Sequence, residues 1–234
     1  IHDTPKDEKL KDLNLLLSKL GLSFEGRGKP TTKNYSSLVE KIRNREDGKM
    51  LETILLRSMP LAEYSASNKG HFGLGFPVYT HFTSPIRRYP DLIVHRIISH
   101  LIDGKGSLLS NYKKQTMLEL SAHCSSTERR AEDASRDAIQ RLKCNFMKDK
   151  EGKTFQGIVS TVASFGLFVL LDDLYVEGLI HISTLPADYY HYDSIAHTLT
   201  GERSGKIFTL GQKLAVTLIR VDIDERKIDF ELNN

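Results

Sequence analysis

Two adjacent arginines, Arg87 and Arg88, stand in the densest polar motif of the sequence, H-F-T-S-P-I-R-R-Y-P-D-L-x-x-H-R, which spans residues 81–96. A guanidinium group binds phosphate through two parallel hydrogen bonds and stabilises charge that develops on a transferring phosphoryl group. The residues alone leave two interpretations even: a grip on phosphate, or a structural arginine paired with Asp91. Hydroxyl and aromatic side chains nearby can add contacts to a nucleic acid, namely Tyr79, Thr83 and Ser84.

Aromatic side chains form a second group of candidate binding residues, in the last third of the chain. Phe165 and Phe168 flank Gly166 in S-F-G-L-F-V, Phe155 precedes them, and His181 follows in E-G-L-I-H-I-S. Every nucleobase has a π face, so a row of exposed aromatic rings binds a flexible nucleic-acid strand whatever its sequence. The alternative is that the two phenylalanines simply fill the core of a barrel.

Metal ligation has little support in the sequence. The histidines at positions 71, 81, 95, 100 and 123 have no cysteine or carboxylate partners at the spacing of a zinc site. His95 is expected to be a hydrogen-bonded core residue, and Cys124 and Cys144 are expected to be two buried thiols in a reducing cytoplasm.

The composition is that of a soluble globular protein, with 39% hydrophobic and 27% charged residues. No apolar run approaches the roughly 20 residues of a membrane span, which argues against a membrane partner. Residues 1–150 contain 26 Lys and Arg against 18 Asp and Glu, a net charge of +8, whereas residues 151–234 contain 7 against 12, a net charge of −5. Attraction to phosphate is therefore expected mainly from the first part of the chain.

Helical spacing of apolar residues dominates up to residue 150. We expect one helix after Thr4-Pro5 that ends at Gly21, two more over residues 35–45 and 49–59, and another from Tyr89 onward. Residues 61–66 and 72–78 can be short strands or extended segments. Residues 111–150 are expected to form one long helix, or two that join near Ser125-Ser126.

Alternation of apolar and polar residues replaces helical spacing after Glu151-Gly152. Segments of β-branched residues with no long helix between them favour a closed five-stranded barrel over a sandwich. The five expected strands cover residues 154–162, 167–171, 176–182, 213–222 and 227–232, with residues 186–206 as a long connection before the fourth. The predicted organisation is α+β, with a mainly helical domain over residues 1–150 and a barrel over residues 151–234.

Both parts resemble known families. Residues 151–234, through G-x-V-x-x-V-x-x-F-G-x-F-V and E-G-L-I-H-I-S, resemble the S1-type RNA-binding domain, which has an OB-fold. The arginine motif, together with L-L-R-S-M, G-H-F-G-L and T-E-R-R-A-E-D-A-S-R-D, resembles the end of the catalytic domain in the ribonuclease II and ribonuclease R (RNB) family of 3′-to-5′ exoribonucleases, and is nearer to ribonuclease R.

The resemblance implies roles for individual residues. Phe155, Phe165, Phe168 and His181 would line the RNA-binding face, and Arg220 would contact phosphate. Arg87 matches the arginine of the P-I-R motif that contacts the scissile region, with Arg88 as the second choice. In that family an aspartate cluster holds Mg²⁺, which activates the attacking water; such a cluster is not visible here, and its ligands are expected upstream of Ile1.

The chain opens Ile1-His2-Asp3 without Met or a signal peptide, so we expect an interior piece of a longer cytoplasmic exoribonuclease. This piece is expected to bind single-stranded RNA, and structured RNA with a 3′ overhang, without degrading it. One alternative is a non-catalytic protein that binds single-stranded RNA. A protein-interaction scaffold whose barrel has lost its ligand fits less well, because the aromatic residues are present.

Overall fold

The computed structural model describes residues 1–25, 28–45, 47–104 and 113–233. The chain divides into two compact units. The first contains Ile1–Leu17, Gly21–Lys41 and Ile54–Asp133, and the second contains Ser18–Leu20, Ile42–Thr53 and Ala134–Asn234. No helix of the described residues is both long enough and apolar enough to cross a membrane.

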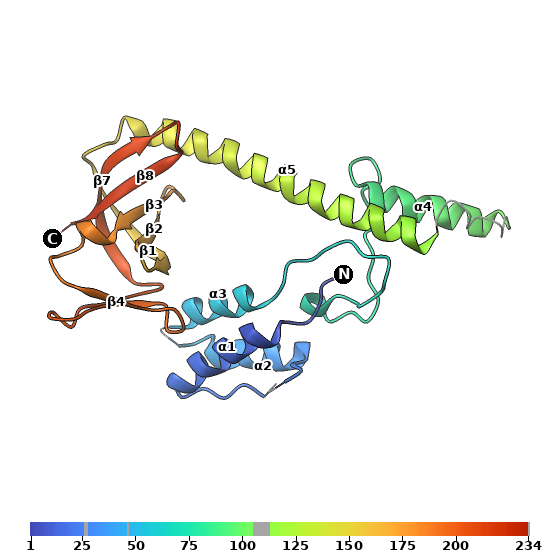
Figure 1. Ribbon diagram of the computed structural model, residues 1–234, viewed down its shortest axis with the longest axis horizontal. Coiled ribbons are helices and arrows are strands. Elements are labelled where there is room, and N and C mark those ends of the chain that lie inside the picture. Colours follow the sequence, from blue (N-terminus) through green and yellow to red (C-terminus); the bar gives the residue numbers. More distant parts are fainter. Residues whose placement is uncertain (26–27, 46, 105–112, 234) are drawn as a thin grey trace. The chain divides into compact units, whose positions relative to one another are not determined.

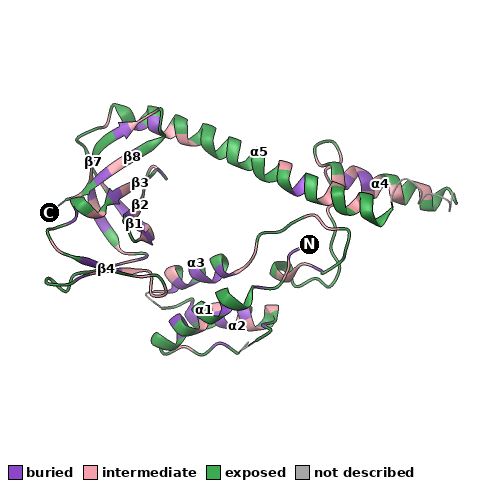
Figure 2. Ribbon diagram, in the orientation of Figure 1, coloured by how far each residue is buried: buried purple, intermediate pink, exposed green. Residues whose placement is uncertain are grey.

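Amphipathic helices make up the N-terminal half of the chain (Figure 1). Their bounds agree with the helical spacing of the sequence to within a few residues: α1 (Asp7–Lys19), α2 (Thr32–Ile42), α3 (Gly48–Ser58) and α4 (Tyr89–Ile102). Helix α1 shows the reason, because Asp7 and Glu8 lie in its first turn and Lys19 in its last, where each charge complements the helix dipole. Leu10 and Leu13 belong to its buried face, which Figure 2 shows in purple.

Residues 61–66 and 72–78, expected as short strands or extended segments, contain no strand among the described residues. Residues 72–78 begin instead with the short 3₁₀ helix η1 (Phe72–Leu74), and isolated bridges join the preceding His71 to His2 and to Phe76. Two glycines explain the difference. Gly70 and Gly75 both have φ near 71°, a left-handed conformation that turns the chain and interrupts a strand.

Helix α5 (Lys114–Lys148) is one continuous helix of 35 residues, which settles whether it breaks near Ser125-Ser126. Ser125 lies within this helix, where its hydroxyl donates to the Ser121 carbonyl one turn earlier at 2.9 Å. The expected start, Asn111, lies outside the described residues. Most of α5 is exposed in Figure 2.

The second unit contains a closed five-stranded barrel with the strand order β1-β2-β3-β8-β7. Its strands are β1 (Thr154–Ala163), β2 (Gly166–Leu171), β3 (Glu177–His181), β7 (Lys213–Asp222) and β8 (Lys227–Leu232). All neighbouring pairs are antiparallel except β3 and β8, whose parallel pairing closes the barrel. The predicted α+β class and five-stranded barrel are confirmed.

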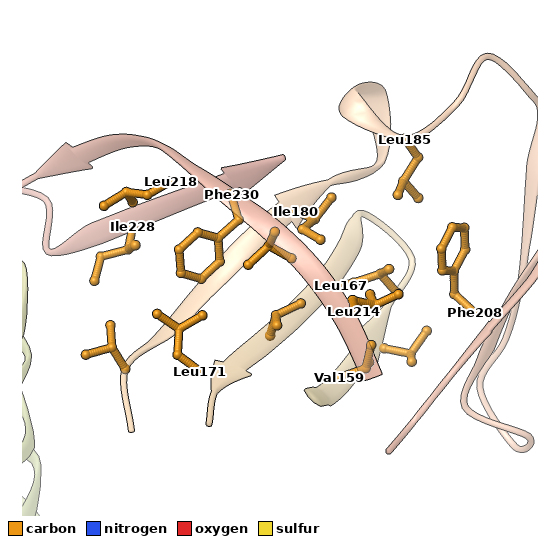
Figure 3. Packing of buried hydrophobic residues seen from close by; sticks show 14 of the residues in the cluster. Val159, Leu167, Leu171, Ile180, Leu185, Phe208, Leu214, Leu218, Ile228 and Phe230 are labelled. Carbon is orange, nitrogen blue, oxygen red and sulfur yellow. The ribbon is translucent and has the colours of Figure 1, made fainter. Parts of the chain in front are cut away.

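Alternate side chains of the barrel strands point inward and form its hydrophobic core (Figure 3). Leu167, Ile180 and Phe230 are at most 1% exposed. Burial of each such side chain contributes about 1.5–3 kcal/mol relative to leaving it in water. Cys144 and Met147 of α5 belong to the same cluster, and Cys124 and Cys144 are both buried free thiols, as expected.

A small antiparallel sheet replaces the long connection that was expected over residues 186–206. It has the order β4-β5-β6 and consists of β4 (Tyr190–Asp193), β5 (Thr198–Gly201) and β6 (Ile207–Thr209). Tyr190, Leu199 and Phe208 on one face join the barrel core cluster. Strands of three or four residues carry too little alternation to be recognised in a sequence.

Candidate nucleic-acid interface

Phe165 and Phe168 lie on the outer side of the barrel. On β2 the side chains of Leu167, Val169 and Leu171 are buried, so the alternating position of Phe168 faces outward, where it is partly exposed. Phe165 precedes the strand and is 48% exposed. The two rings meet edge to face, with centroids 5.9 Å apart, which leaves ring surface available to a planar partner.

His181 completes this aromatic group from the neighbouring strand. It pairs with Gly166 in the β2–β3 register and is exposed. Its Nδ1 lies 2.8 Å from the Ser183 hydroxyl, a contact that fixes the ring orientation. Gly166 permits the close approach: its φ is 151°, and a Cβ there would lie 2.2 Å from the Ile180 carbonyl oxygen.

The register also aligns Arg220 with Phe168. Phe168 pairs with Leu179, Leu179 with Asp229, and Asp229 with Arg220, which gives one row across the outer surface of four strands. Measured around the curved surface, three strand spacings separate the row's ends, or about 14 Å. Arg220 is exposed and donates to the Asp222 carboxylate at 2.7 Å, so a phosphate would have to share its guanidinium with that carboxylate.

Phe155 does not join this group. Gly157 pairs with Leu171 and Ala163 with Gly166, so Phe155 lies beyond the end of β2 that is remote from Phe165. It also has the inward parity of Gly157 and Val159, and its ring packs against the barrel core. The expectation that all three phenylalanines gather on one face is therefore not met for Phe155.

In the first unit, the two arginines lie at a turn that we call the arginine turn (Ser84–Arg88). The backbone N–H groups of Arg87 and Arg88 both donate to the Ser84 carbonyl, at 3.2 and 2.9 Å. The Arg88 side chain is 18% exposed and donates Nε and Nη2 to Asp91 Oδ2, at 3.2 and 2.9 Å. Arg87 is exposed and forms no ion pair with any residue that the structure describes.

The structural interpretation therefore holds for Arg88, and the Arg87 guanidinium remains available to a ligand. Around the turn, Thr83 is exposed and Ser84 is half-buried, with its backbone N–H donating to Asp91 Oδ2 at 2.8 Å. Tyr79 is 38% exposed and is stacked on Phe76, with centroids 6.3 Å apart. Its ring also meets His71 edge to face.

Sequence patterns did not single out Tyr64 and Glu128, which approach the same region. The Tyr64 hydroxyl lies 3.3 Å from His81 Nδ1 and 3.3 Å from Glu128 Oε1. Burial, and secondly the Glu128 carboxylate, raise the pKa of Tyr64 to about 12. Burial, and secondly Arg88, lower the pKa of His81. Tyr64, His81 and Glu128 line a pocket of about 570 Å³; no sequence signal joins three residues so far apart.

The described residues do not form a metal centre of their own. No group of three or more His, Cys, Asp or Glu side chains that could hold an ion occurs among them. The acidic pair Asp172-Asp173 lies in the exposed turn that follows β2 and belongs to no such group.

Family comparisons identify both parts of the chain. Residues 1–104 match the RNB domain and residues 148–233 match the S1 RNA binding domain. The chain therefore carries an RNB domain and an S1 RNA binding domain. Its relatives include ribonuclease R of Escherichia coli, 46% identical over 99% of this chain and 30% of that protein, and ribonuclease R of Aquifex aeolicus, 40% identical over 99% and 33%.

The chain thus spans about a third of the length of these relatives. Among solved structures, it is similar to Mycoplasma genitalium RNase R, both in the apo form and in complex with ribose-methylated single-stranded RNA. The TM-score is 0.89 and the identity 28% over 100% of this chain and 37% of that chain. Yeast Ssd1, a pseudonuclease, shares the fold at a TM-score of 0.64 and 24% identity, over 85% of this chain and 25% of its own.

Proposed function

We propose that the protein carrying this chain is a cytoplasmic 3′-to-5′ exoribonuclease that hydrolyses RNA phosphodiester bonds and releases nucleoside 5′-monophosphates. The observation that carries the proposal is that two adjacent arginines, in the segment that matches the RNB domain, have different surroundings. Asp91 holds Arg88, while Arg87 presents an exposed guanidinium from a turn with a fixed backbone. The similarity to ribonuclease R over 99% of the chain supports the reaction class.

In this proposal Arg87 binds the scissile phosphate and stabilises the charge that develops during hydrolysis. Tyr79, Thr83 and Ser84 add contacts to the same strand, and Arg88 is the second choice for the catalytic arginine. Mg²⁺ held by residues outside those described would supply activation of the attacking water and charge compensation at the leaving oxygen. Because the described residues offer no cluster to hold it, we propose that the 234-residue chain alone binds RNA without cleaving it.

The barrel supplies RNA binding in the same proposal. Phe165, Phe168 and His181 stack on the bases of a single strand, and Arg220 contacts a phosphate. Phe155, which packs against the barrel core, is not part of this surface. Single-stranded RNA is the proposed ligand, and a structured RNA with a 3′ overhang presents the same kind of end. The complex of Mycoplasma genitalium RNase R with ribose-methylated single-stranded RNA supports this assignment.

A second candidate is a non-catalytic protein that binds single-stranded RNA. The observation that favours it is the shared fold of Ssd1, a pseudonuclease. The fold alone therefore does not distinguish an enzyme from a binding protein, and only a measured reaction does.

The test uses the longest natural form of the protein and, beside it, the 234-residue chain. Each is incubated with 5′-labelled single-stranded RNA, with Mg²⁺ or with a chelator. We expect the long form to shorten the RNA from its 3′ end only with Mg²⁺, and the 234-residue chain to bind the RNA intact. Arg87→Ala should lower turnover by about 100-fold or more, the usual loss for one group that stabilises transition-state charge.

RNA affinity should change little in Arg87→Ala, because the barrel still binds the strand. Arg96→Ala is the matched control, since Arg96 is an exposed arginine of α4 outside the arginine turn. Unchanged turnover in Arg87→Ala would count against its catalytic role. Absence of hydrolysis by the long form, with normal RNA binding, would favour the non-catalytic alternative.

A further inference from the structure

The segment that leads into the arginine turn is fixed to α4 at more than one point. Asp91 and His95 lie four residues apart on that helix, so their side chains share one face. Each contacts the segment that precedes the helix. Asp91 binds Ser84 and Arg88, and His95 binds Phe82.

Asp91 makes its contacts through one oxygen. Oδ2 accepts from the Ser84 backbone N–H at 2.8 Å and from Arg88 Nε and Nη2 at 3.2 and 2.9 Å, so it joins both ends of the turn. The side chain is 0% exposed, and Oδ1 is buried without a partner among the described residues. A buried carboxylate stays charged when a cation and hydrogen bonds compensate it, and removing it would leave the Arg88 guanidinium without its partner.

His95 fixes the segment two residues earlier than Ser84. Its ring is stacked on Phe82, with centroids 4.4 Å apart and planes 5° from parallel. Its Nε2 lies 2.9 Å from the Phe82 carbonyl oxygen, which can only accept, so Nε2 carries the proton and donates. Together, the ring stack and the hydrogen bond hold Phe82 in position relative to α4.

We propose that Asp91 and His95 are positioning residues that place the Arg87 guanidinium, an inference that rests on the proposed function. The Arg87 guanidinium has no partner among the described residues to hold it, so its position depends on the backbone of the turn. That backbone is held at Phe82, Ser84 and Arg88 by the two α4 side chains. Displacement of a catalytic group by about 1 Å can cost about 100-fold in rate, even when the mutated residue touches no substrate.

The test compares paired variants in the longest natural form of the protein. Asp91→Ala should lower kcat by about 100-fold with little change in KM, because the lost effect concerns the transition state. Asp91→Asn should lower kcat less than Asp91→Ala, because its amide oxygen can still accept at the Oδ2 position although the charge that compensates Arg88 is lost. A purely structural carboxylate would not give this split between kcat and KM.

His95→Phe provides a milder second variant, which keeps the ring stack on Phe82 and removes only the hydrogen bond. It should lower kcat by about tenfold. A tenfold change corresponds to about 1.4 kcal/mol, which is within the usual net contribution of one hydrogen bond. Ser99→Ala, one turn further along α4, is the control and should change nothing. If Asp91→Ala does not fold, His95→Phe carries the test.

A double-mutant cycle identifies the route of the effect. If Asp91 and His95 act through Arg87, then neither substitution should lower turnover further in the Arg87→Ala background. Losses that multiply with that of Arg87→Ala, or full turnover in both Asp91→Ala and His95→Phe, would overturn the inference while leaving the proposed function intact. Absence of hydrolysis by the wild-type long form would instead overturn the proposed function and the inference with it.

Discussion

Adjacent residues of the same type can have opposite roles, as Arg87 and Arg88 illustrate. The sequence identified both and also named Asp91 as a partner, but it could not say which arginine Asp91 takes. That choice depends on the direction of two side chains in a turn. The structure assigns Asp91 to Arg88, which is why the proposed contact with the scissile phosphate falls to Arg87.

Phe165 and Phe168 support a prediction for RNA affinity. Phe165→Ala and Phe168→Ala should each weaken the binding of single-stranded RNA by about 1–3 kcal/mol, the usual loss for one stacked base. The measurement is a titration of a labelled oligonucleotide with the 234-residue chain. Tyr175→Ala is the control, because Tyr175 is an exposed aromatic residue beyond the opposite end of β2.

Equal losses in all three variants would mean that the barrel is perturbed generally, and unchanged affinity would mean that the two phenylalanines only pack.

The sequence motif placed Phe165, Phe168 and His181 together correctly in space. It failed for Phe155 because the side that a strand residue faces depends on parity and register, which only the paired strands define. The contact of Tyr64 with His81 and Glu128 likewise could not be predicted from the sequence, since it joins three distant segments.

At the scale of elements, secondary structure was predicted correctly where the apolar residues repeat regularly over a long stretch. The five barrel strands and α5 extend over enough residues for alternation or helical spacing to be counted. The sheet β4-β5-β6 has no such signal, and its position depends on tertiary contacts of Tyr190, Leu199 and Phe208 with the barrel core. In residues 61–78, left-handed glycines override a strand-like composition.

Asp188 provides a test of what holds the small sheet. Its carboxylate accepts from the Ser204 hydroxyl at 2.6 Å and from the backbone N–H groups of Ser204 and Arg203 at 2.9 and 3.0 Å. These bonds, the Ser204 hydroxyl first, hold the pKa of Asp188 well below its ordinary value of 3.8. A lowered pKa contributes stability above the ordinary value, and this stability is lost as the pH falls below it.

The corresponding prediction concerns the free energy of unfolding of Asp188→Ala and the wild type, measured by denaturant titration from pH 7 to pH 3. The difference between the two proteins should be largest at neutral pH and should shrink as the pH falls below about 4. Asp173→Asn is the control, because Asp173 is an exposed turn residue. A difference that grows at low pH would show that the carboxylate does not carry this stability.

At the scale of the whole molecule, the net positive charge and the Phe165–Phe168 pair lie in different parts of the chain. Residues 1–150 have a net charge of +8, while residues 151–234, which include that pair, have a net charge of −5. Phosphate contacts release counterions and make binding depend on salt, whereas stacking does not. Salt titrations can therefore separate the two contributions in the intact chain.

Arg220→Ala should reduce the slope of log affinity against log salt concentration by about 0.7, the amount expected for one lost phosphate contact on a single strand. Phe165→Ala should lower affinity at every salt concentration and leave the slope unchanged. Both variants are measured with the same oligonucleotide. An unchanged slope in Arg220→Ala would mean that Asp222 keeps this guanidinium and that phosphate does not reach it.

The two sheets of the second unit also differ in whether they have unpaired edge strands. A closed barrel offers no unpaired edge, but the order β4-β5-β6 leaves one side of β4 and one side of β6 with backbone groups outside any described ladder. Such edges are where a second chain can add a strand. If this protein pairs with a second chain while it is still folded, we expect the pairing at the edges of the small sheet, where strands of three and four residues keep any added ladder short.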